Sequence, residues 1–401
     1  ISVAADDASG RISFYDLNAA ANAGKVADVN ANGYVDAGDL LTPYKANGTG
    51  GWEDGKNGKN NKADHYVDDI IGWDFANNDN DPMDTDGHGT HTAGIIGAEG
   101  NNGIGVSGVV WKTSLMALKV FADGGDGASD AAIAAAIRYA ANAGAKVTNN
   151  SYGGAGGANG GVIYNALQYA EAKGMISVFA AGNDGVNNDT SRDASYPATY
   201  ALSDIISVAA DDASGRITYW SNYGATSVDL AAPGDEVYST YLGGGYQTES
   251  GTSMAAPFVT GTVALMLSQN PALTAADVKA RLLTGADQTQ TLVGNTVSGG
   301  TLDAAKALQG TAGTLVTATT TTPTSPVTTP TVPTTPTYVY VPVFGYPPGF
   351  GYGGGGYGGF GGYGGYSRSS IVVTTTTAST SEATWAVLAS AAPGYGWQFV
   401  G

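Results

Sequence analysis

The chain has 401 residues, of which 42% are hydrophobic, enough for one full-sized core with appended segments. Its formal net charge of −18 argues against a nucleic-acid partner, because no basic stripe is available to meet phosphate groups. The sequence contains no cysteine, which excludes disulfide bonds, and no apolar run long enough to span a membrane.

The first twelve residues, ISVAADDASGRI, return letter for letter at 206–217. The second copy has strand-like neighbours, so it has a structural role where it stands. The first copy has no such context, and the chain shows neither an initiator Met nor a signal peptide. We therefore expect residues 1–12 to be a duplicated or misjoined piece in an N-terminally incomplete chain. A genuine N-terminal strand is the alternative.

Residues 1–72 are rich in Asp, Asn and Gly and predict a loop-rich segment that holds ions. The string DVNANGYVDAGD at 28–39 fits a twelve-residue EF-hand loop, with glycine at the sixth position and an apolar residue at the eighth. Its final aspartate, in place of glutamate, resembles the dockerin-type variant. A solvated Asp/Asn turn is the alternative. The predicted calcium ligands are Asp28, Asn30, Asn32, Tyr34 through its carbonyl, Asp36 and Asp39.

From about residue 104 to residue 308, short apolar runs alternate with stretches of helical spacing. This alternation predicts an α/β domain whose parallel sheet is covered on both faces, with active groups at the carboxyl ends of the strands. The predicted strands include 114–121, 176–183 and 205–212, and the predicted helices include 130–145 and 161–174.

The core pattern ends after Gly310. Residues 311–344 are rich in Thr and Pro and predict an extended linker, and residues 345–401 form a Gly/Tyr-rich, low-complexity tail that we expect to be disordered. A spacer is the plain interpretation of this tail. Attachment to a cell surface, wall or polysaccharide is the alternative.

The three histidines of the chain are His65, His88 and His91. Two of them lie in DTDGHGTHTAGIIGA (84–98), where small residues flank His88 and an apolar run follows. A histidine before Gly and Thr at the start of a helix can be held at the mouth of a cleft. A structural role is the alternative, and the spacing of three residues also suits a metal site.

Two further motifs carry candidate polar groups. Ser253 lies in GTSMAAPFVTGTVALML (251–267), where a loop enters an apolar helix with Pro257 in the first turn, so that its hydroxyl points outward near the positive end of the helix dipole. Asn183 ends the apolar strand in FAAGNDG (179–185), and its amide can donate to a developing oxyanion. Taken singly, an N-cap serine and an asparagine turn are the simpler interpretations.

Together, HGTH, NNSYGG (149–154), AAGND and GTSMAAP, in that order and spacing, resemble the motifs of the subtilisin-like serine proteases, the subtilases. The resemblance covers about residues 73–308 and includes the strings NNGIGVSG, ALKVF and VDLAAPG. It implies a three-layer fold in which helices cover both faces of a central parallel sheet, with a catalytic domain at 73–310.

By this resemblance His88 is the general base, Ser253 the nucleophile and Asn183 the oxyanion donor. The chemistry agrees, because a serine hydroxyl attacks only when an imidazole takes its proton, and the imidazole needs a carboxylate to fix its tautomer. The tetrahedral intermediate needs prearranged N–H donors. The resemblance thus implies a secreted, calcium-stabilised, monomeric endopeptidase that acts on protein or peptide substrates.

The resemblance also assigns residues around these three groups. Those that would bind the substrate and form one wall of its main pocket are Ser151, Tyr152 and Gly153, with Thr252 and Met254 as flanking supports. Those that would form a further calcium loop are Asn102 and the carbonyls of Ile104 and Val106.

The triad aspartate is the missing part. The family places it before the histidine, in a motif like Val-Ile-Asp-Thr-Gly, and no such motif precedes His88 here. We expect it upstream of residue 1; Asp6 follows the strand-like ISVAA but lacks Thr-Gly behind it, which makes it a weak imitation. Two functions therefore stay open: an active endopeptidase, and an inactive subtilase scaffold that binds a partner or attaches to a surface.

Overall fold

The structure is a computed structural model that describes residues 20–23, 27–29, 35, 39, 66, 69, 71–124, 127–156, 161–313 and, for the backbone only, 315–316. The first copy of the repeat with Asp6, the predicted calcium ligands Asn30, Asn32, Tyr34 and Asp36, and the predicted tail lie outside these residues.

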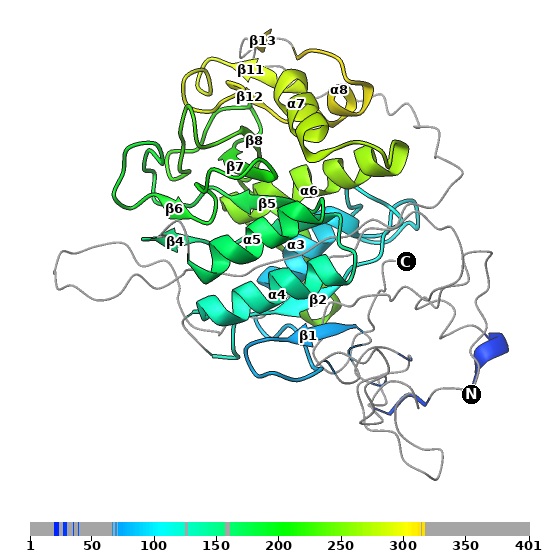
Figure 1. Cartoon of the computed structure of the whole chain (residues 1–401). Helices are drawn as coiled ribbons and strands as arrows, with labels where there is room; N and C mark the ends of the chain where they lie inside the picture. Colours follow the sequence, from blue (N-terminus) through cyan, green and yellow to red (C-terminus); the bar gives the residue numbers. More distant parts are fainter. Residues whose placement is uncertain are drawn as a thin grey trace, which may run out of the picture.

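A seven-stranded sheet forms the centre of the molecule (Figure 1). Its strands, in spatial order, are β13 (Leu315–Val316), β11 (Asp287–Thr289), β12 (Gly300–Thr301), β8 (Leu230–Pro233), β7 (Ile205–Asp211), β5 (Ile176–Ala180) and β3 (Val147–Asn150). From β12 to β3 every neighbouring pair is parallel, as predicted. β11 runs antiparallel to β12, so the sheet is mixed at that edge.

The parallel strands are buried on both faces, which explains why they read as continuous apolar runs rather than as alternating ones. β5 and β7 are buried along their whole length. β7 contains the first six residues of the second copy of the repeat, 206–211, so the strand predicted at 205–212 is confirmed.

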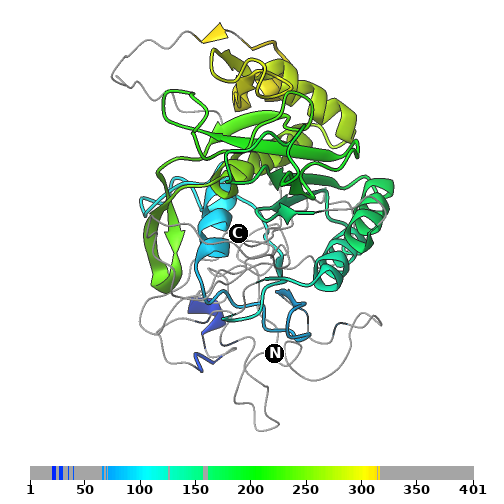
Figure 2. The same ribbon diagram turned by 90° about the vertical axis from the view of Figure 1, so that its left-hand side faces the viewer.

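Helices cover both faces of the sheet, and Figure 2 shows α4 and α5 on one side of it with α3 on the other. The helices are α3 (His88–Gly97), α4 (Asp130–Asn142), α5 (Val162–Ala172), α6 (Thr252–Gln269), α7 (Ala275–Gly285) and α8 (Ala304–Gln309), with short 3-10 turns η1 (Ala20–Asn22) and η2 (Leu242–Gly244). α4 packs alongside α5, and α6 packs against α3 and against four strands of the sheet, β3, β5, β7 and β8.

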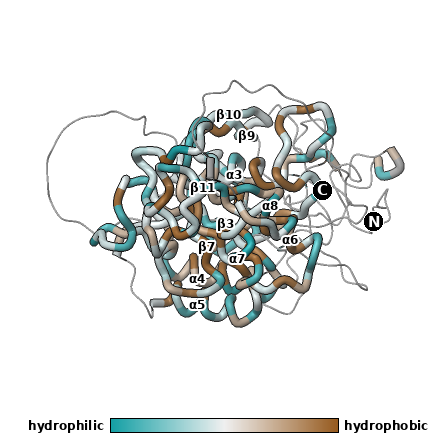
Figure 3. The backbone as a smooth tube through the Cα atoms, turned by 90° about the horizontal axis from the view of Figure 1, so that it is seen from above, coloured by the Kyte–Doolittle hydropathy of each residue, from teal (hydrophilic) through white to brown (hydrophobic). Residues whose placement is uncertain are grey.

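Helix α6 is the central helix of the fold. Apolar and small residues occupy nearly all of its sides, as expected for a helix surrounded by protein. Pro257 is its sixth residue, which places the proline in the second turn and corrects the prediction of the first. In Figure 3, hydrophobic stretches run through the inner elements around β7.

Three pairs of short strands lie outside the main sheet. They are β1 (Gly72–Asp74) with β2 (Ala117–Lys119), β4 (Gly154–Ala155) with β6 (Ser195–Tyr196), and the hairpin of β9 (Val237–Tyr241) and β10 (Gly245–Glu249). The apolar run predicted as a strand at 114–121 contains β2, which pairs with β1 instead of joining the central sheet. β13 lies in the stretch predicted as a linker, where it adds a last strand to the sheet beside β11.

Within the described part of the chain, no helix combines the length and the apolar character that a membrane crossing requires.

Candidate active site

The candidate site forms where the ends of two central strands meet the starts of two helices. β3 ends at Asn150, just before Ser151, and β5 ends at Ala180, three residues before Asn183. α3 begins at His88, and α6 begins one residue before Ser253. Parallel strands bring their carboxyl ends to one edge of the sheet, so motifs far apart in the sequence converge there.

His88 is held in place by its helix start. The N-cap residue Gly87 has φ 110°, a conformation that favours glycine. The buried carboxylate of Asp84 accepts hydrogen bonds from the backbone N–H of Gly87 (3.0 Å) and, through its other oxygen, from the N–H (2.8 Å) and hydroxyl (2.6 Å) of Thr90. Asp84 therefore caps the first turn of α3, the turn that carries His88.

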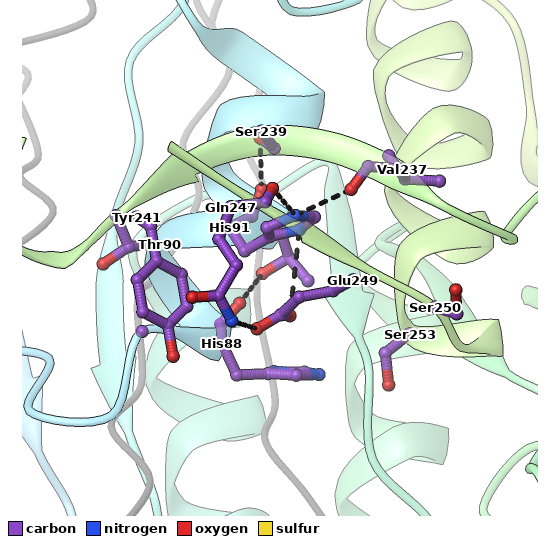
Figure 4. A network of polar contacts seen from close by, with 12 residues as sticks. His88, Thr90, His91, Val237, Ser239, Tyr241, Gln247, Glu249, Ser250 and Ser253 are labelled. Carbon is purple, nitrogen blue, oxygen red and sulfur yellow. Dashed lines mark hydrogen bonds and ion pairs between the residues drawn. The ribbon is translucent and has the colours of Figure 1, made fainter. Parts of the chain in front are cut away.

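His91 faces the other way, toward the hairpin of β9 and β10 (Figure 4). Its Nε2 lies 3.0 Å from the carbonyl oxygens of both Val237 and Gln247, so Nε2 carries the proton. Burial lowers the pKa of His91 to about 4, so the ring is neutral at pH 7. The structural interpretation of His91 fits this geometry, and no group of three or more His, Asp or Glu side chains suited to a metal occurs in the described ranges.

The hydroxyl of Ser253 lies at the start of α6, and the His88 ring extends toward it (Figure 4). Both side chains are 7% exposed, so they are sheltered but reachable. The Ser253 hydroxyl donates a long hydrogen bond of 3.4 Å to the backbone carbonyl of Ser151.

The amide of Asn183 has a fixed orientation. Its Oδ1 accepts hydrogen bonds from the backbone N–H (2.9 Å) and the hydroxyl (2.8 Å) of Thr252, so Nδ2 is the atom left to donate elsewhere. A Cβ atom placed on Gly251 would lie 3.6 Å from Asn183 Nδ2 and 3.6 Å from the backbone nitrogen of Ser253. The two nitrogens thus flank one small space, which Gly251 leaves open.

The predicted substrate-binding residues follow β3. Ser151 and Tyr152 are buried, and the Tyr152 ring packs edge-on against Phe179 with a centroid distance of 5.7 Å, so this ring belongs to the core. Gly153 lies against Ser195, whose hydroxyl would be 2.4 Å from a Cβ placed on the glycine. Within the predicted segment, Ser151 contacts Ser253 through both its hydroxyl and its carbonyl, while the Tyr152 ring points into the interior.

Of the predicted EF-hand-like ligands, the described part of the chain contains Asp28 and Asp39. The carboxylate of Asp39 is fully buried and accepts a hydrogen bond of 2.5 Å from the backbone N–H of Val29, which joins the two ends of the loop. In the second predicted loop, Asn102 Oδ1 accepts a hydrogen bond of 2.9 Å from the N–H of Ile104.

Four polar residues near the site were not identified from the sequence. The Asp84 cap has a local signal, because an aspartate before a helix start is a common capping pattern. Glu249 comes within 3.9 Å of His91 Nδ1 only because β10 folds back over α3. Asn149 and Thr260 are joined by a hydrogen bond across 111 sequence positions, and no local pattern predicts such a contact.

A serine hydroxyl toward which an imidazole extends, with two N–H donors around one open space, is suited to acyl transfer. In such a reaction the imidazole takes the serine proton and the donors stabilise the oxyanion. A family model described as the subtilase family matches residues 19–311 of the chain.

Two relatives identified by sequence agree with this match. Thermitase of Thermoactinomyces vulgaris is 41% identical over 240 residues, 60% of this chain and 81% of thermitase. A thermophilic serine proteinase of Bacillus sp. (strain AK1) is 45% identical over 201 residues, 50% of this chain and 47% of that protein, so the chain spans about half of its length. Among solved structures, a prenylagaramide maturation protease has a TM-score of 0.49 and 28% identity, covering 56% of this chain and 83% of that one.

Proposed function

Because the chain belongs to the subtilase family of serine-type endopeptidases, we propose that it cleaves peptide bonds with Ser253 as nucleophile, His88 as general base and the Asn183 amide with the Ser253 N–H as oxyanion donors. The observation that carries the proposal is the position of the two nitrogens, each 3.6 Å from one point beside Gly251. In support of the nucleophile, the His88 ring extends toward Ser253 (Figure 4).

In the proposed reaction, Ser253 Oγ bonds to the substrate carbonyl carbon while its proton passes to His88. The carbonyl oxygen becomes an oxyanion between the Asn183 amide and the Ser253 N–H. His88 then gives the proton to the leaving amine, and a water molecule hydrolyses the acyl-enzyme by the same steps. The backbone of Ser151 to Gly153 is suited to hold the extended substrate, because it runs directly beside the nucleophile.

A fluorophosphonate probe tests this assignment. Labelling should occur at Ser253 alone, and Ser253→Ala and His88→Ala should abolish it. His91→Ala should retain labelling in whatever fraction of the protein folds, because that ring faces the hairpin. Labelling that persists in Ser253→Ala would refute the nucleophile.

The carboxylate partner of His88 is tested separately, with Asp6 as the candidate within the chain. Loss of the triad aspartate costs about 10⁴ in turnover in subtilisin, itself a member of this family. We expect Asp6→Asn to leave casein hydrolysis unchanged, and a version whose first twelve residues are replaced by a strand ending in Asp-Thr-Gly to be much faster. Full activity that is lost in Asp6→Asn would identify Asp6 as the third member of the triad.

We also propose that calcium stabilises the fold and that the protein acts outside the cell, as a monomer. The contact between Asp39 and the Val29 N–H supports the first loop, since it joins the second and the last of its twelve positions. The oxygen donors Asn102, Ile104 and Val106 suit a hard cation in the second. Where bound, calcium would link segments that have no disulfide to connect them.

A further inference from the structure

The carbonyl of Ser253 has lost its usual helical partner. In an α-helix the carbonyl of residue 253 accepts from the N–H of residue 257, and residue 257 of helix α6 is a proline, which has no N–H. The Ser253 carbonyl instead accepts a hydrogen bond of 2.8 Å from the hydroxyl of Ser151, which comes from the end of β3. The residue that directly follows β3 thus supplies the donor that the helix lacks at the candidate nucleophile.

The Ser151 hydroxyl is in turn part of a directed series. Thr260 Oγ1 donates to Asn149 Oδ1 (2.9 Å), and Asn149 Nδ2 donates to Ser151 Oγ (2.9 Å). Because the Ser253 carbonyl can only accept, the Ser151 proton must point toward it, and the Asn149 amide occupies an acceptor position of the same oxygen. The bonds made by Ser151 and Asn149 therefore have one possible direction, and Thr260 is the donor to Asn149, with the Ala256 carbonyl as a second acceptor of its hydroxyl at 3.1 Å.

The series is fully enclosed by protein. Asn149, Ser151 and Thr260 have no exposed surface, so solvent cannot replace a lost donor without entering the core. Hydrogen bonds in such an environment reinforce one another, and a buried carbonyl left without a donor is costly. Thr260 lies two turns along α6 from Ser253, so the series ties the first turn of this helix both to β3 and to its own interior.

We propose that Ser151, oriented by Asn149 and Thr260, is a positioning residue for the nucleophile: its hydroxyl replaces the helical hydrogen bond that Pro257 removes and thereby holds Ser253 in register with the oxyanion donors. The proposal rests on the proposed function of Ser253. The benefit is that a proline can stiffen the helix near the nucleophile, while the adjoining backbone stays attached to the strand that would bind the substrate.

A double-mutant cycle between Ser151→Ala and Pro257→Ala tests this proposal. Ser151→Ala alone should lower kcat about tenfold, because a small misplacement of the nucleophile relative to the oxyanion donors slows its attack, with a smaller change in KM. Pro257→Ala restores an N–H that can reach the Ser253 carbonyl. In that background Ser151→Ala should cost less than about threefold in kcat. Equal costs in both backgrounds, or an unchanged kcat in Ser151→Ala, would overturn the proposal.

The orienting role of Thr260 has a matched control in the same helix. Thr260→Val removes the hydroxyl that donates to Asn149, whereas Thr262→Val removes a buried hydroxyl that donates to the Phe258 carbonyl at 2.9 Å, away from Ser253. Thr260→Val should lower kcat in the wild-type background and have no further effect in Ser151→Ala. If the two valine variants have the same kcat, the orienting role is wrong.

All variants are compared as active-site-titrated enzyme on a peptide p-nitroanilide, with urea unfolding measured alongside. If the unchanged chain is neither labelled nor active, the proposed function fails first. In that case the free energies of unfolding of Ser151→Ala, Pro257→Ala and the double variant test whether the Ser151 hydroxyl replaces the helical hydrogen bond. Non-additive effects of the two substitutions support the replacement, and additive effects overturn it.

Discussion

Gly251 offers the sharpest test of the oxyanion site, because a substitution there can block the site without disturbing the fold. Its φ of 162° is extended backbone that any residue adopts. A Cβ at this position meets no atom closer than 3.6 Å, which is ordinary van der Waals contact. Gly251→Ala should therefore fold with an unfolding free energy within about 0.5 kcal/mol of the unchanged protein, as expected where no contact is lost or strained.

The added methyl group would nevertheless lie 3.6 Å from both proposed donors, Asn183 Nδ2 and Ser253 N. An oxyanion must come within about 2.7–3.1 Å of its donors, and on that face the methyl carbon takes the space it would occupy. Loss of one such donor in subtilisin, a member of this family, lowers kcat by about 10²–10³. We expect Gly251→Ala to reach at least the lower of these figures, about 2.7 kcal/mol of transition-state stabilisation.

The assay is kcat on a peptide p-nitroanilide, with the melting temperature of the same sample. Gly245→Ala in β10 is the matched control, because a Cβ there has its nearest contact at 3.4 Å and lies in the hairpin, at the end away from Ser253. A Gly251→Ala variant with unchanged kcat would refute the location of the oxyanion site. A lowered melting temperature in Gly251→Ala, alongside the lowered kcat, would refute the claim that the added methyl group fits the folded protein.

Three further predictions concern stability. His91 has a pKa of about 4 in the folded state and 6.5 in the unfolded chain, so the unfolded chain binds more protons between these two pH values. The free energy of unfolding of the unchanged protein should therefore fall by about 3 kcal/mol as pH falls from 6.5 to 4. In urea unfolding, His91→Gln should lack this pH dependence. Burial and the nearby negative charge of Glu171 raise the pKa of Asp204 to about 7, so the folded state binds more protons than the unfolded chain between pH 4 and 7. The free energy of unfolding should therefore fall by about 4 kcal/mol as pH rises through this range, and Asp204→Asn should remove this loss. Chelation of calcium should lower the melting temperature, since a cation at a hundredfold excess over its Kd contributes about 2.7 kcal/mol to the free energy of unfolding. Asp28→Ala combined with Asp39→Ala should remove much of this response. An identical melting curve with and without chelator would contradict the calcium proposal.

The sequence predicts most reliably the elements whose apolar pattern is decided locally. β5, β7, α4 and α5 lie within their predicted ranges, because a doubly buried strand and an amphipathic helix each have a characteristic spacing. The sequence predicts the position of β2 along the chain correctly, but not the sheet to which β2 belongs. Its partner β1 is only three residues long, and so short a strand has no sequence pattern from which the pairing could be predicted.

The repeat illustrates the same limit. In its second copy the ISVAAD string is β7, and Asp211 ends this strand as a buried carboxyl group whose pKa burial raises to about 7. The identical letters at residues 1–6 have no such surroundings in the sequence, and this is why Asp6 could be named only as a weak candidate. A strand sequence specifies its own burial pattern, while the role of an aspartate at its end depends on neighbours that the string does not contain.

The start of α6 differs from the starts of α4, α7 and α8, and resembles that of α5, whose N-cap Gly161 also makes no side-chain bond. The N-cap residues of α4, α7 and α8 are Ser129, Thr274 and Asp303, whose side chains accept hydrogen bonds from first-turn N–H groups. α6 begins after Gly251, which has no side chain to do this, and its N-cap makes no such bond. A capping side chain is worth about 1 kcal/mol, so a helix without one gives up stability at that end. In α6 the N–H of Thr252 bonds to Asn183 Oδ1 and thereby orients the amide. No N-cap side chain covers the N–H of Ser253, which is one of the two proposed oxyanion donors. The 14 buried residues of α6 and the Ser151 hydroxyl at its first turn hold the helix in place without a cap.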